Sequence, residues 1–330
     1  MCQVQKSDTL DLLDRRIVAA LQVNARAPFA AVAAVLGEQE RTVARRAERL
    51  LESGAVRLTA FVDELRTGRA QPVTLRIAVE PGALDDVARQ LCARPDIRAV
   101  LAVTGGADLC CDLVAQDQVT LHQVLAGELP AIPGVRSTSS HAVLRHVKPA
   151  SRWRLPLLDA AQVRQLAPTS ESAAEAASAS ERVELAEADL ALITALQVDA
   201  RLSYAELGAR VGVTSTTARR RTDRLLASGA LTLRAAVEPA RLGLPVESDV
   251  WLNVRPDALD AVSRRLATRS EVTYCGVVAG TYAVEALVAL PDLTQLYSFL
   301  TEVIGAEPDV RDCEPTLVTR AYKRGYLLID

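Results

Sequence analysis

The sequence predicts a mixed α+β fold in which one module occurs twice in tandem, a winged or plain helix-turn-helix domain followed by a ferredoxin-like βαββαβ domain. The first observation behind this prediction is a repeat at a fixed offset of 175 positions (from 14 to 189). The repeated segments include Ala20-Leu21-Gln22-Val23 with Ala195-Leu196-Gln197-Val198, Arg45-Arg46 with Arg220-Arg221, and Ser53-Gly54-Ala55 with Ser228-Gly229-Ala230. The second observation is the order within each copy, where helical periodicity precedes strand-like alternation. A repeat this long is a duplicated module, because solenoid units are only about 20–50 residues long.

The composition fits a protein with several buried cores and argues against a membrane protein. The chain has 330 residues, of which 49% are hydrophobic, and no apolar run reaches the roughly 18 residues that span a bilayer. Residues 1–8 lack the charged and then apolar pattern of a secretory signal, so a cytoplasmic protein is expected. The formal net charge is −3, but arginines are concentrated in two short segments, and the local field governs DNA binding.

The second copy shows the helix-turn-helix pattern more clearly than the first. It predicts a helix over 189–198, a short helix from Ser203 to Gly212, and a longer helix from Thr214 to about Ser228. Ser203 and Glu206 have the spacing of a capping box, in which each side chain satisfies a free backbone N–H at a helix start. Gly212 suits the left-handed conformation that ends a helix, and Thr214 suits the next N-cap. The arginines lie on this third helix.

The first copy repeats this order with two departures. Its helices are expected over 14–23, 29–36 and 41–52. No capping box precedes the second helix, which begins Pro28-Phe29-Ala30-Ala31. Glu38 occupies the position of Val213, a turn position that we expect to face the core, and Glu38-Gln39-Glu40 places acidic groups at the start of the arginine-bearing helix. The second helix-turn-helix is therefore the stronger prediction.

A βαββαβ pattern follows each helix-turn-helix, after a short β-prone run over 56–62 or 231–237. The expected strands and helices are 73–79, 84–91, 97–103, 109–114, 121–129 and 139–147 in the first copy, and 249–254, 259–266, 272–278, 283–289, 293–303 and 315–322 in the second. This order is that of the ferredoxin-like split motif. The domains are thus expected over 8–68, 70–150, 183–243 and 246–330, with a linker over 151–182. The linker has enough Leu and Val for a short helix before 167, whereas 167–180 is expected to be flexible.

This architecture resembles the Lrp/AsnC (leucine-responsive) family of transcription regulators. The segments that carry the resemblance are Leu196–Ser203, Tyr204–Thr214, Ala218–Leu231, Val103–Leu109 and Ile132–Val135. The resemblance implies binding to double-stranded DNA, assembly into homo-oligomers, and a sensing domain that binds an amino acid or another small effector. It covers nearly the whole chain except the linker. One departure is Gly280-Thr281-Tyr282-Ala283, where the aspartate of the family's Gly-x-x-Asp turn is lost.

The arginines of the two third helices are the predicted DNA contacts. A charge run is usually a solvated face, but this one recurs on the third helix of both copies. Arginine suits the role because its planar group can bond guanine or phosphate through two hydrogen bonds. The predicted contacts are Thr214, Ser215, Thr216, Arg219, Arg220, Arg221 and Arg224 in the second copy, and Arg41, Arg45, Arg46 and Arg49 in the first. The residues nearest the helix start are expected to read bases, and Arg224 to hold phosphate.

Gly105 and Asp108 are the candidate effector-binding residues, in the one intact Gly-x-x-Asp turn. The resemblance implies that this turn lines an effector pocket, where the Asp108 carboxylate could pair with an α-ammonium group. An ordinary turn-stabilising role for Asp108 is equally open, because aspartate side chains commonly bond nearby backbone in turns.

The cysteines and histidines give no metal or cofactor prediction. Cys110 and Cys111 are adjacent, so on a strand they point to opposite faces, and no Cys-x-x-Cys or Cys/His ligand spacing occurs. We therefore expect no metal, no cofactor and no catalytic residues. The cysteines are expected to be small core residues.

Two alternative functions remain beside the regulator. The first is an enzyme resembling the sirohaem decarboxylases, which are similar to this family in fold and would use His and Arg of the ferredoxin-like half. Against it, both copies keep arginine-rich third helices, whereas His122, His141 and His146 occur in the first copy alone. The second alternative is an effector-binding assembly module with a decayed first DNA-binding unit, which the acidic Glu38-Gln39-Glu40 segment favours. A non-enzymatic regulator is the main prediction.

Overall fold

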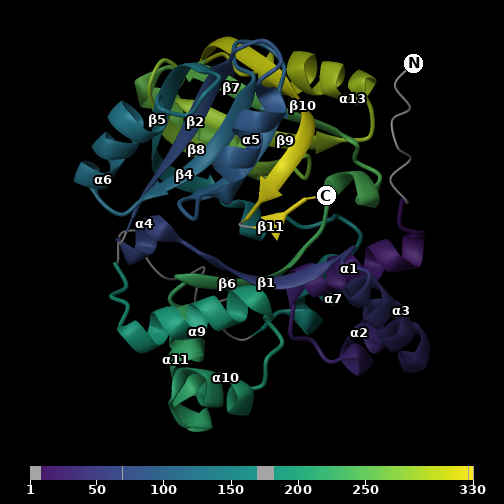
Figure 1. Cartoon of the computed structure of the whole chain (residues 1–330). Helices are drawn as coiled ribbons and strands as arrows, with labels where there is room; N and C mark the ends of the chain where they lie inside the picture. Colours follow the sequence, from purple (N-terminus) through teal and green to yellow (C-terminus); the bar gives the residue numbers. More distant parts are fainter. Residues whose placement is uncertain (1–8, 69, 169–181, 326, 330) are drawn as a thin grey trace. The chain divides into compact units, whose positions relative to one another are not determined.

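The computed structural model describes residues 9–68, 70–168, 182–325 and 327–329 (Figure 1). The chain forms two compact units, each built from both copies of the repeat. The helical unit contains the segments that end at Gly68 and that span Trp153–Gly243, and the sheet unit contains the segments that end at Arg152 and begin again at Leu244. The predicted mixture of helix-turn-helix and βαββαβ elements is confirmed. The two copies pair within one chain, a point that the sequence left open.

The helical unit contains two three-helix bundles, each followed by a strand. Its elements are α1 (Leu12–Val23), α2 (Phe29–Leu36), α3 (Glu40–Glu52), β1 (Arg57–Val62), α4 (Glu64–Thr67), α7 (Ala160–Leu166), α9 (Glu187–Val198), α10 (Tyr204–Val211), α11 (Ser215–Ala227) and β6 (Leu231–Ala236). The first helix of each copy begins two residues earlier than expected. The capping box at Ser203 and Glu206 is present, and Gly212 has the left-handed φ of 74° that ends α10.

The two copies meet through their short strands. β1 and β6 pair antiparallel with each other, with Thr59 opposite Arg234, so neither strand forms a wing with its own bundle. Two repeat-equivalent arginines extend this pairing. Arg26 donates to the carbonyls of Ala200 (2.7 Å) and Leu202 (2.9 Å), and Arg201 donates in return to the carbonyls of Ala25 and Ala27. The helical unit is therefore a pseudo-two-fold pair of helix-turn-helix bundles.

The linker segment adds a helix to the first bundle. α7 has a capping box formed by Asp159 and Gln162. The Gln162 amide donates to the carbonyl of Val35 (2.9 Å), and Asn24 donates to the carbonyl of Leu166 (3.0 Å). The predicted flexible stretch over 167–180 lies almost entirely outside the described residues.

The sheet unit contains two βαββαβ repeats. Its elements are β2 (Gln71–Val79), α5 (Leu84–Ala93), β3 (Ile97–Val103), β4 (Leu109–Ala115), α6 (Gln118–Gln123), β5 (Val135–Lys148), β7 (Val246–Val254), α12 (Leu259–Ala267), β8 (Val272–Ala279), β9 (Val284–Leu290), α13 (Leu293–Ser298), β10 (Val310–Arg324) and β11 (Leu327–Leu328). The last helix of each repeat continues as a π-helical turn, over Val124–Glu128 and Phe299–Ile304.

Two long strands join the repeats into a closed ring. β5 pairs with β2 in its first half and with β8 of the other repeat in its second half. β10 likewise pairs first with β7 and then with β3. Among the described residues the ring runs β10-β3-β4-β2-β5-β8-β9-β7 and returns to β10, with β11 added beside β10. Every pairing is antiparallel. The long strand at the edge of each repeat forms backbone hydrogen bonds with a strand of the other repeat, so neither edge is left open.

Side-chain alternation gives each strand of the ring two different environments. One face of β2 and β4 packs the apolar core of the first repeat, which includes Leu75, Ile77 and Cys111. The equivalent face in the second repeat includes Val250 and Leu252. Because successive residues point to opposite faces, the residues between them face the other repeat. Those intervening residues are mostly polar, and they form the seam between the repeats.

Candidate functional site

A buried aspartate in the first helix of each bundle holds the arginine-bearing helix in place. Asp189 on α9 is fully buried and accepts from Arg221 (3.0 Å) and Arg224 (2.6 Å) of α11. Asp14 on α1, its repeat equivalent, does the same for the α3 arginines at the matching positions. Two charge-assisted bonds to one buried carboxylate are among the stronger polar contacts in proteins. The sequence reasoning missed both aspartates, although the same offset that relates the arginines also relates them.

The remaining arginines of these helices are exposed and carry few contacts. Arg41 and Arg45 on α3 and Arg220 on α11 are exposed and have no hydrogen bond or ion pair with a described residue. Arg219 makes a 3.6 Å contact with Asp223, in which both side chains are more than half exposed. Such an exposed pair contributes little to stability. The structure thus divides the predicted DNA contacts into an anchored set, which pairs with a buried aspartate (Arg46, Arg49, Arg221 and Arg224), and an unanchored set (Arg41, Arg45, Arg219 and Arg220).

The start of α11 presents small hydroxyl side chains to solvent. Thr214 caps the helix, because its hydroxyl oxygen accepts from the backbone N–H of Thr217 (3.2 Å). Thr214, Ser215 and Thr216 are exposed, and this end of the helix carries the positive end of the helix dipole. α11 contains four arginines and one aspartate, so the helix carries a net positive charge.

The start of α3 is different. Gln39 occupies the N-cap position and makes no side-chain cap, and Glu38 and Glu40 lie on either side of it. All three are exposed, so the expectation that the Glu38 position faces the core is wrong for the first copy. A charged carboxylate is costly to bury, and here the side chain points outward while the equivalent Val213 is half-buried. α3 combines four arginines with three glutamates, and its field is correspondingly weaker.

The Gly-x-x-Asp turn lies between β3 and β4, beside the seam. Gly105 has a φ of 95°, which favours glycine. One carboxylate oxygen of Asp108 accepts from the backbone N–H of Val79 (2.8 Å). The Gly106 N–H donates to Glu314 of the second repeat (3.2 Å), whose carboxylate also pairs with Arg76. Asp108 therefore has a structural bond within its own repeat, while the turn reaches the other repeat through Gly106.

The histidines of the first repeat do not share one set of partners. His141 is buried on β5, with its ring 4.8 Å from that of Trp251, and burial lowers its pKa. His146 lies on the same strand and contacts the ring of Tyr274 (5.8 Å). His122 is exposed on α6. This arrangement gives no convergent catalytic constellation among the described histidines.

Helix-turn-helix bundles joined to βαββαβ domains define a class of proteins in which a DNA-binding half is coupled to a sensing half. Models of two families match this chain twice each. The AsnC-type helix-turn-helix domain matches residues 10–51 and 185–226, and the Lrp/AsnC ligand binding domain matches residues 73–153 and 250–328. The chain belongs to the Lrp/AsnC family of transcriptional regulators, with the whole family architecture duplicated in tandem.

Curated relatives agree with this assignment and are about half as long. An uncharacterized HTH-type transcriptional regulator of Pyrococcus abyssi is 31% identical over 148 residues, which cover 44% of this chain and 94% of the relative. The HTH-type transcriptional regulator Ptr1 of Methanocaldococcus jannaschii is 30% identical over 138 residues, covering 42% of this chain and 93% of the relative. One such relative therefore corresponds to one copy of the repeat.

A solved structure shares the tandem fold over nearly the whole chain. The siroheme decarboxylase NirDL has a TM-score of 0.61 at 16% identity, covering 94% of this chain and 92% of that one. At this identity the similarity shows the fold alone. Within the described residues, no helix is both long and apolar enough to cross a membrane.

Proposed function

We propose that the protein is a sequence-specific DNA-binding transcriptional regulator in which α11 makes the principal contacts. The observation that carries this proposal is that the arginines of α11 form two groups with different contacts. Asp189 fixes the helix through Arg221 and Arg224, while Arg219 and Arg220 remain exposed. A helix that a buried carboxylate holds on its inner side, with exposed guanidinium groups on its outer side, suits insertion into a major groove.

The roles of individual residues follow from their positions. Thr214, Ser215 and Thr216 at the helix start, with Arg219 and Arg220 one turn later, are the proposed base and phosphate contacts. The side chains of Arg221 and Arg224 are 30% and 51% exposed, so they can also touch the DNA backbone, but their main role is to orient the helix. We assign Arg45 and Arg41 to weaker contacts from α3, and Arg46 and Arg49 to the same orienting role there.

The pairing of the two helix-turn-helix bundles within one chain also supports a DNA-binding function. β1 pairs with β6, and the reciprocal bonds of Arg26 and Arg201 lie next to the second helices. A conventional two-fold regulator presents two recognition helices to two half-sites. Here a single chain presents a non-identical pair, and we propose that its operator has two unequal half-sites. Further assembly into homo-oligomers is part of this proposal.

The experiment is a binding titration with the full chain. A labelled duplex from the region upstream of the gene is titrated with protein, and binding is followed by fluorescence anisotropy at several salt concentrations. We expect the double variant Arg219→Ala/Arg220→Ala to lose at least about tenfold in affinity and to show a shallower salt dependence. Arg311→Ala is the matched control, because Arg311 is an exposed arginine of the sheet unit. Equal affinity of the double variant and the control would overturn the assignment of α11.

The small-molecule effector is proposed to bind beside the Gly105–Asp108 turn. Arg76 lies against the rings of Trp251 (5.2 Å) and Tyr282 (5.9 Å) and pairs with Glu314. An amino acid could place its carboxylate on Arg76 and the Gly106 N–H in place of Glu314, and its ammonium near Asp108. Calorimetric titration with single amino acids tests this, and Arg76→Met should abolish any binding that occurs. Binding that is unchanged in that variant would place the effector elsewhere.

An enzyme of the sirohaem-decarboxylase type is the second candidate, supported by the tandem fold shared with NirDL. This function predicts that the protein binds sirohaem and that its catalytic residues lie in the sheet unit and include a histidine. A spectral titration with sirohaem distinguishes the two: a regulator gives no change in the Soret region, whereas binding with subsequent loss of carboxylate groups would favour the enzyme.

A further inference from the structure

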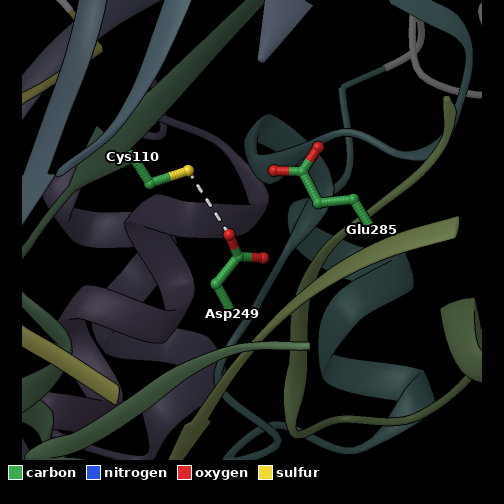
Figure 2. Close-up of side chains that lie close together, drawn as sticks. All are labelled: Cys110, Asp249 and Glu285. Atoms are coloured by element: carbon green, nitrogen blue, oxygen red, sulfur yellow. Dashed lines mark hydrogen bonds between the residues drawn. The ribbon is translucent and has the colours of Figure 1, made fainter. Parts of the chain in front are cut away.

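Four buried polar side chains meet at the seam between the two repeats of the sheet unit. They are Thr74, Cys110, Asp249 and Glu285, and none is more than 6% exposed. Positions 74 and 249 are repeat equivalents, as are positions 110 and 285, so the pseudo-two-fold relation between the repeats brings all four together. Figure 2 shows the thiol of Cys110 and the carboxylates of Asp249 and Glu285 around a common space. We call these three side chains the seam triad.

The hydrogen bonds of this cluster leave one carboxylate incompletely satisfied. The Thr74 hydroxyl donates to Glu285 (2.8 Å), and the Cys110 thiol donates to one oxygen of Asp249 (3.4 Å). The other oxygen of Asp249 is buried and has no hydrogen-bond partner. No ion pair reaches Asp249 or Glu285 from any described residue, because the nearby Arg76 is engaged by Glu314.

Two adjacent buried carboxylates without a direct ion-pair partner among the described residues are an expensive arrangement inside a protein, and Arg76 and Arg98 act on them only from a distance. Burial raises the pKa of Asp249 to about 7. Burial, and then the proximity of Asp249, raise the pKa of Glu285 well above its usual value. The Cys110 thiol lies beside both carboxylates and adds a third donor atom, which completes a metal-ligand set.

We propose that Cys110, Asp249 and Glu285 bind a divalent transition-metal ion of the Zn²⁺ type at the seam between the two sensing repeats. Their ligand atoms lie within 4.8 Å of one another. In a tetrahedral zinc site, typical bond lengths place sulfur and oxygen ligands about 3.6 Å apart. The Cys110–Asp249 distance of 3.4 Å already fits, and the Glu285 oxygen, which lies within 4.8 Å of both other ligand atoms, would have to move closer to bind the ion.

The donor types select the class of ion. A thiolate disfavours Ca²⁺ and Mg²⁺, which take oxygen ligands, and favours Zn²⁺, Co²⁺ or Fe²⁺. The two carboxylates alone would balance the two positive charges of the ion, and with the thiolate the bound site would carry one net negative charge. Three protein ligands leave a fourth position for water or for a small molecule. The bound ion would join β4 of one repeat to β7 and β9 of the other.

The test is metal binding by the full chain, produced with Zn²⁺ in the medium and analysed by elemental mass spectrometry after dialysis. One ion per chain is expected. Replacement by Co²⁺ should give a thiolate-to-cobalt charge-transfer absorption, which reports the cysteine directly. A wild-type chain that retains no zinc and shows no cobalt band would overturn the proposal, and the pair would then hold a proton instead.

Three variants identify the ligands. Cys110→Ser should remove the charge-transfer band and weaken zinc binding at least about tenfold. Asp249→Asn keeps the side-chain shape and removes a buried charge, so it should fold as well as the wild type without metal, yet lose the stabilisation that added zinc gives. Cys111→Ala is the matched control, because Cys111 is the next residue on β4 and lies in the apolar core. A band that persists in Cys110→Ser, or wild-type zinc affinity in Asp249→Asn, would contradict the assignment.

Discussion

The two helix-turn-helix bundles keep the same internal anchor but present different outer surfaces. In both, a buried aspartate of the first helix holds two arginines of the third. The first bundle adds Asp11, which also pairs with Arg46, where the second has Ala186. The outer surfaces differ at the start of the third helix. The first bundle has Glu38-Gln39-Glu40 there, and the second has Val213-Thr214-Ser215 at the equivalent positions. The residues that position the third helix are the same in both bundles, whereas the residues at its start differ, although Arg45 and Arg220 are equivalent.

Replacing the buried aspartate of one bundle should have the largest effect, a loss of local stability that is confined to that bundle. Asp189→Ala breaks two charge-assisted bonds and leaves the Ala186 N–H without its acceptor. We expect α11 to lose about 3 kcal/mol of local stability. Hydrogen–deuterium exchange of the full chain measures this, because α3 serves as an internal reference. Asp14→Ala should reverse the pattern. Asp223→Ala removes two exposed contacts, the ion pair with Arg219 and a hydrogen bond from the Tyr204 hydroxyl, and should change little. Unaltered protection of α11 in Asp189→Ala would show that the anchor is dispensable.

The anchors also show what sequence patterns could and could not provide. The fold class and the order of elements followed from hydrophobic period, glycine positions and the repeat, because these depend on neighbours within one segment. The seam triad and the Asp189 contacts depend on which segments meet in space. No ligand spacing signals Cys110 with Asp249 and Glu285, since the three lie on different strands of two repeats. The sequence likewise grouped the arginines as one DNA-binding set. The structure separates them into anchored and unanchored arginines, because it locates the aspartates that pair with some of them.

A glycine in the second bundle should give the next largest effect. A Cβ atom at Gly208 would lie 2.6 Å from the carbonyl oxygen of Val213, so the turn before α11 must shift in Gly208→Ala. We expect a loss of about 2 kcal/mol despite the better helix propensity of alanine, together with weaker DNA binding. The first bundle has a buried Ala33 at this position, so Ala33→Gly should cost the propensity difference of about 1 kcal/mol and the packing of one methyl group, about 0.8 kcal/mol. Denaturant unfolding of both variants measures the two values, and a stabilised Gly208→Ala would mean that the two turns are interchangeable.

Exchanging the helix starts tests whether the acidic segment explains the weaker surface of α3. The triple variant Glu38→Val/Gln39→Thr/Glu40→Ser gives the first bundle the residues of the second. We expect about tenfold tighter binding to duplex DNA at low salt, because two negative charges are removed near phosphates. The gain should shrink as salt is raised. If the affinity is unchanged at all salt concentrations, α3 does not approach the duplex, and the first bundle serves the pairing of the two copies alone.

The smallest expected effect concerns the strand pair that joins the bundles. Thr59 and Arg234 face each other across β1 and β6 and are repeat equivalents. Thr59 donates to the carbonyl of Gln197 (2.7 Å), whereas Arg234 is only 4% exposed, and its buried Nη2 has no hydrogen-bond partner. Burial lowers the pKa of Arg234 well below its usual value, and the charge of Arg154 adds to this.

An uncompensated buried charge opposes folding, so Arg234→Thr should stabilise the helical unit, by about 1 kcal/mol once the lost packing of the arginine stem is subtracted. Thermal unfolding gives the sign directly, with Arg57→Thr on the exposed end of β1 as the control. A destabilised Arg234→Thr would show that the guanidinium has a stabilising partner in solution, such as a bound anion, and the asymmetry at this pair would then be functional.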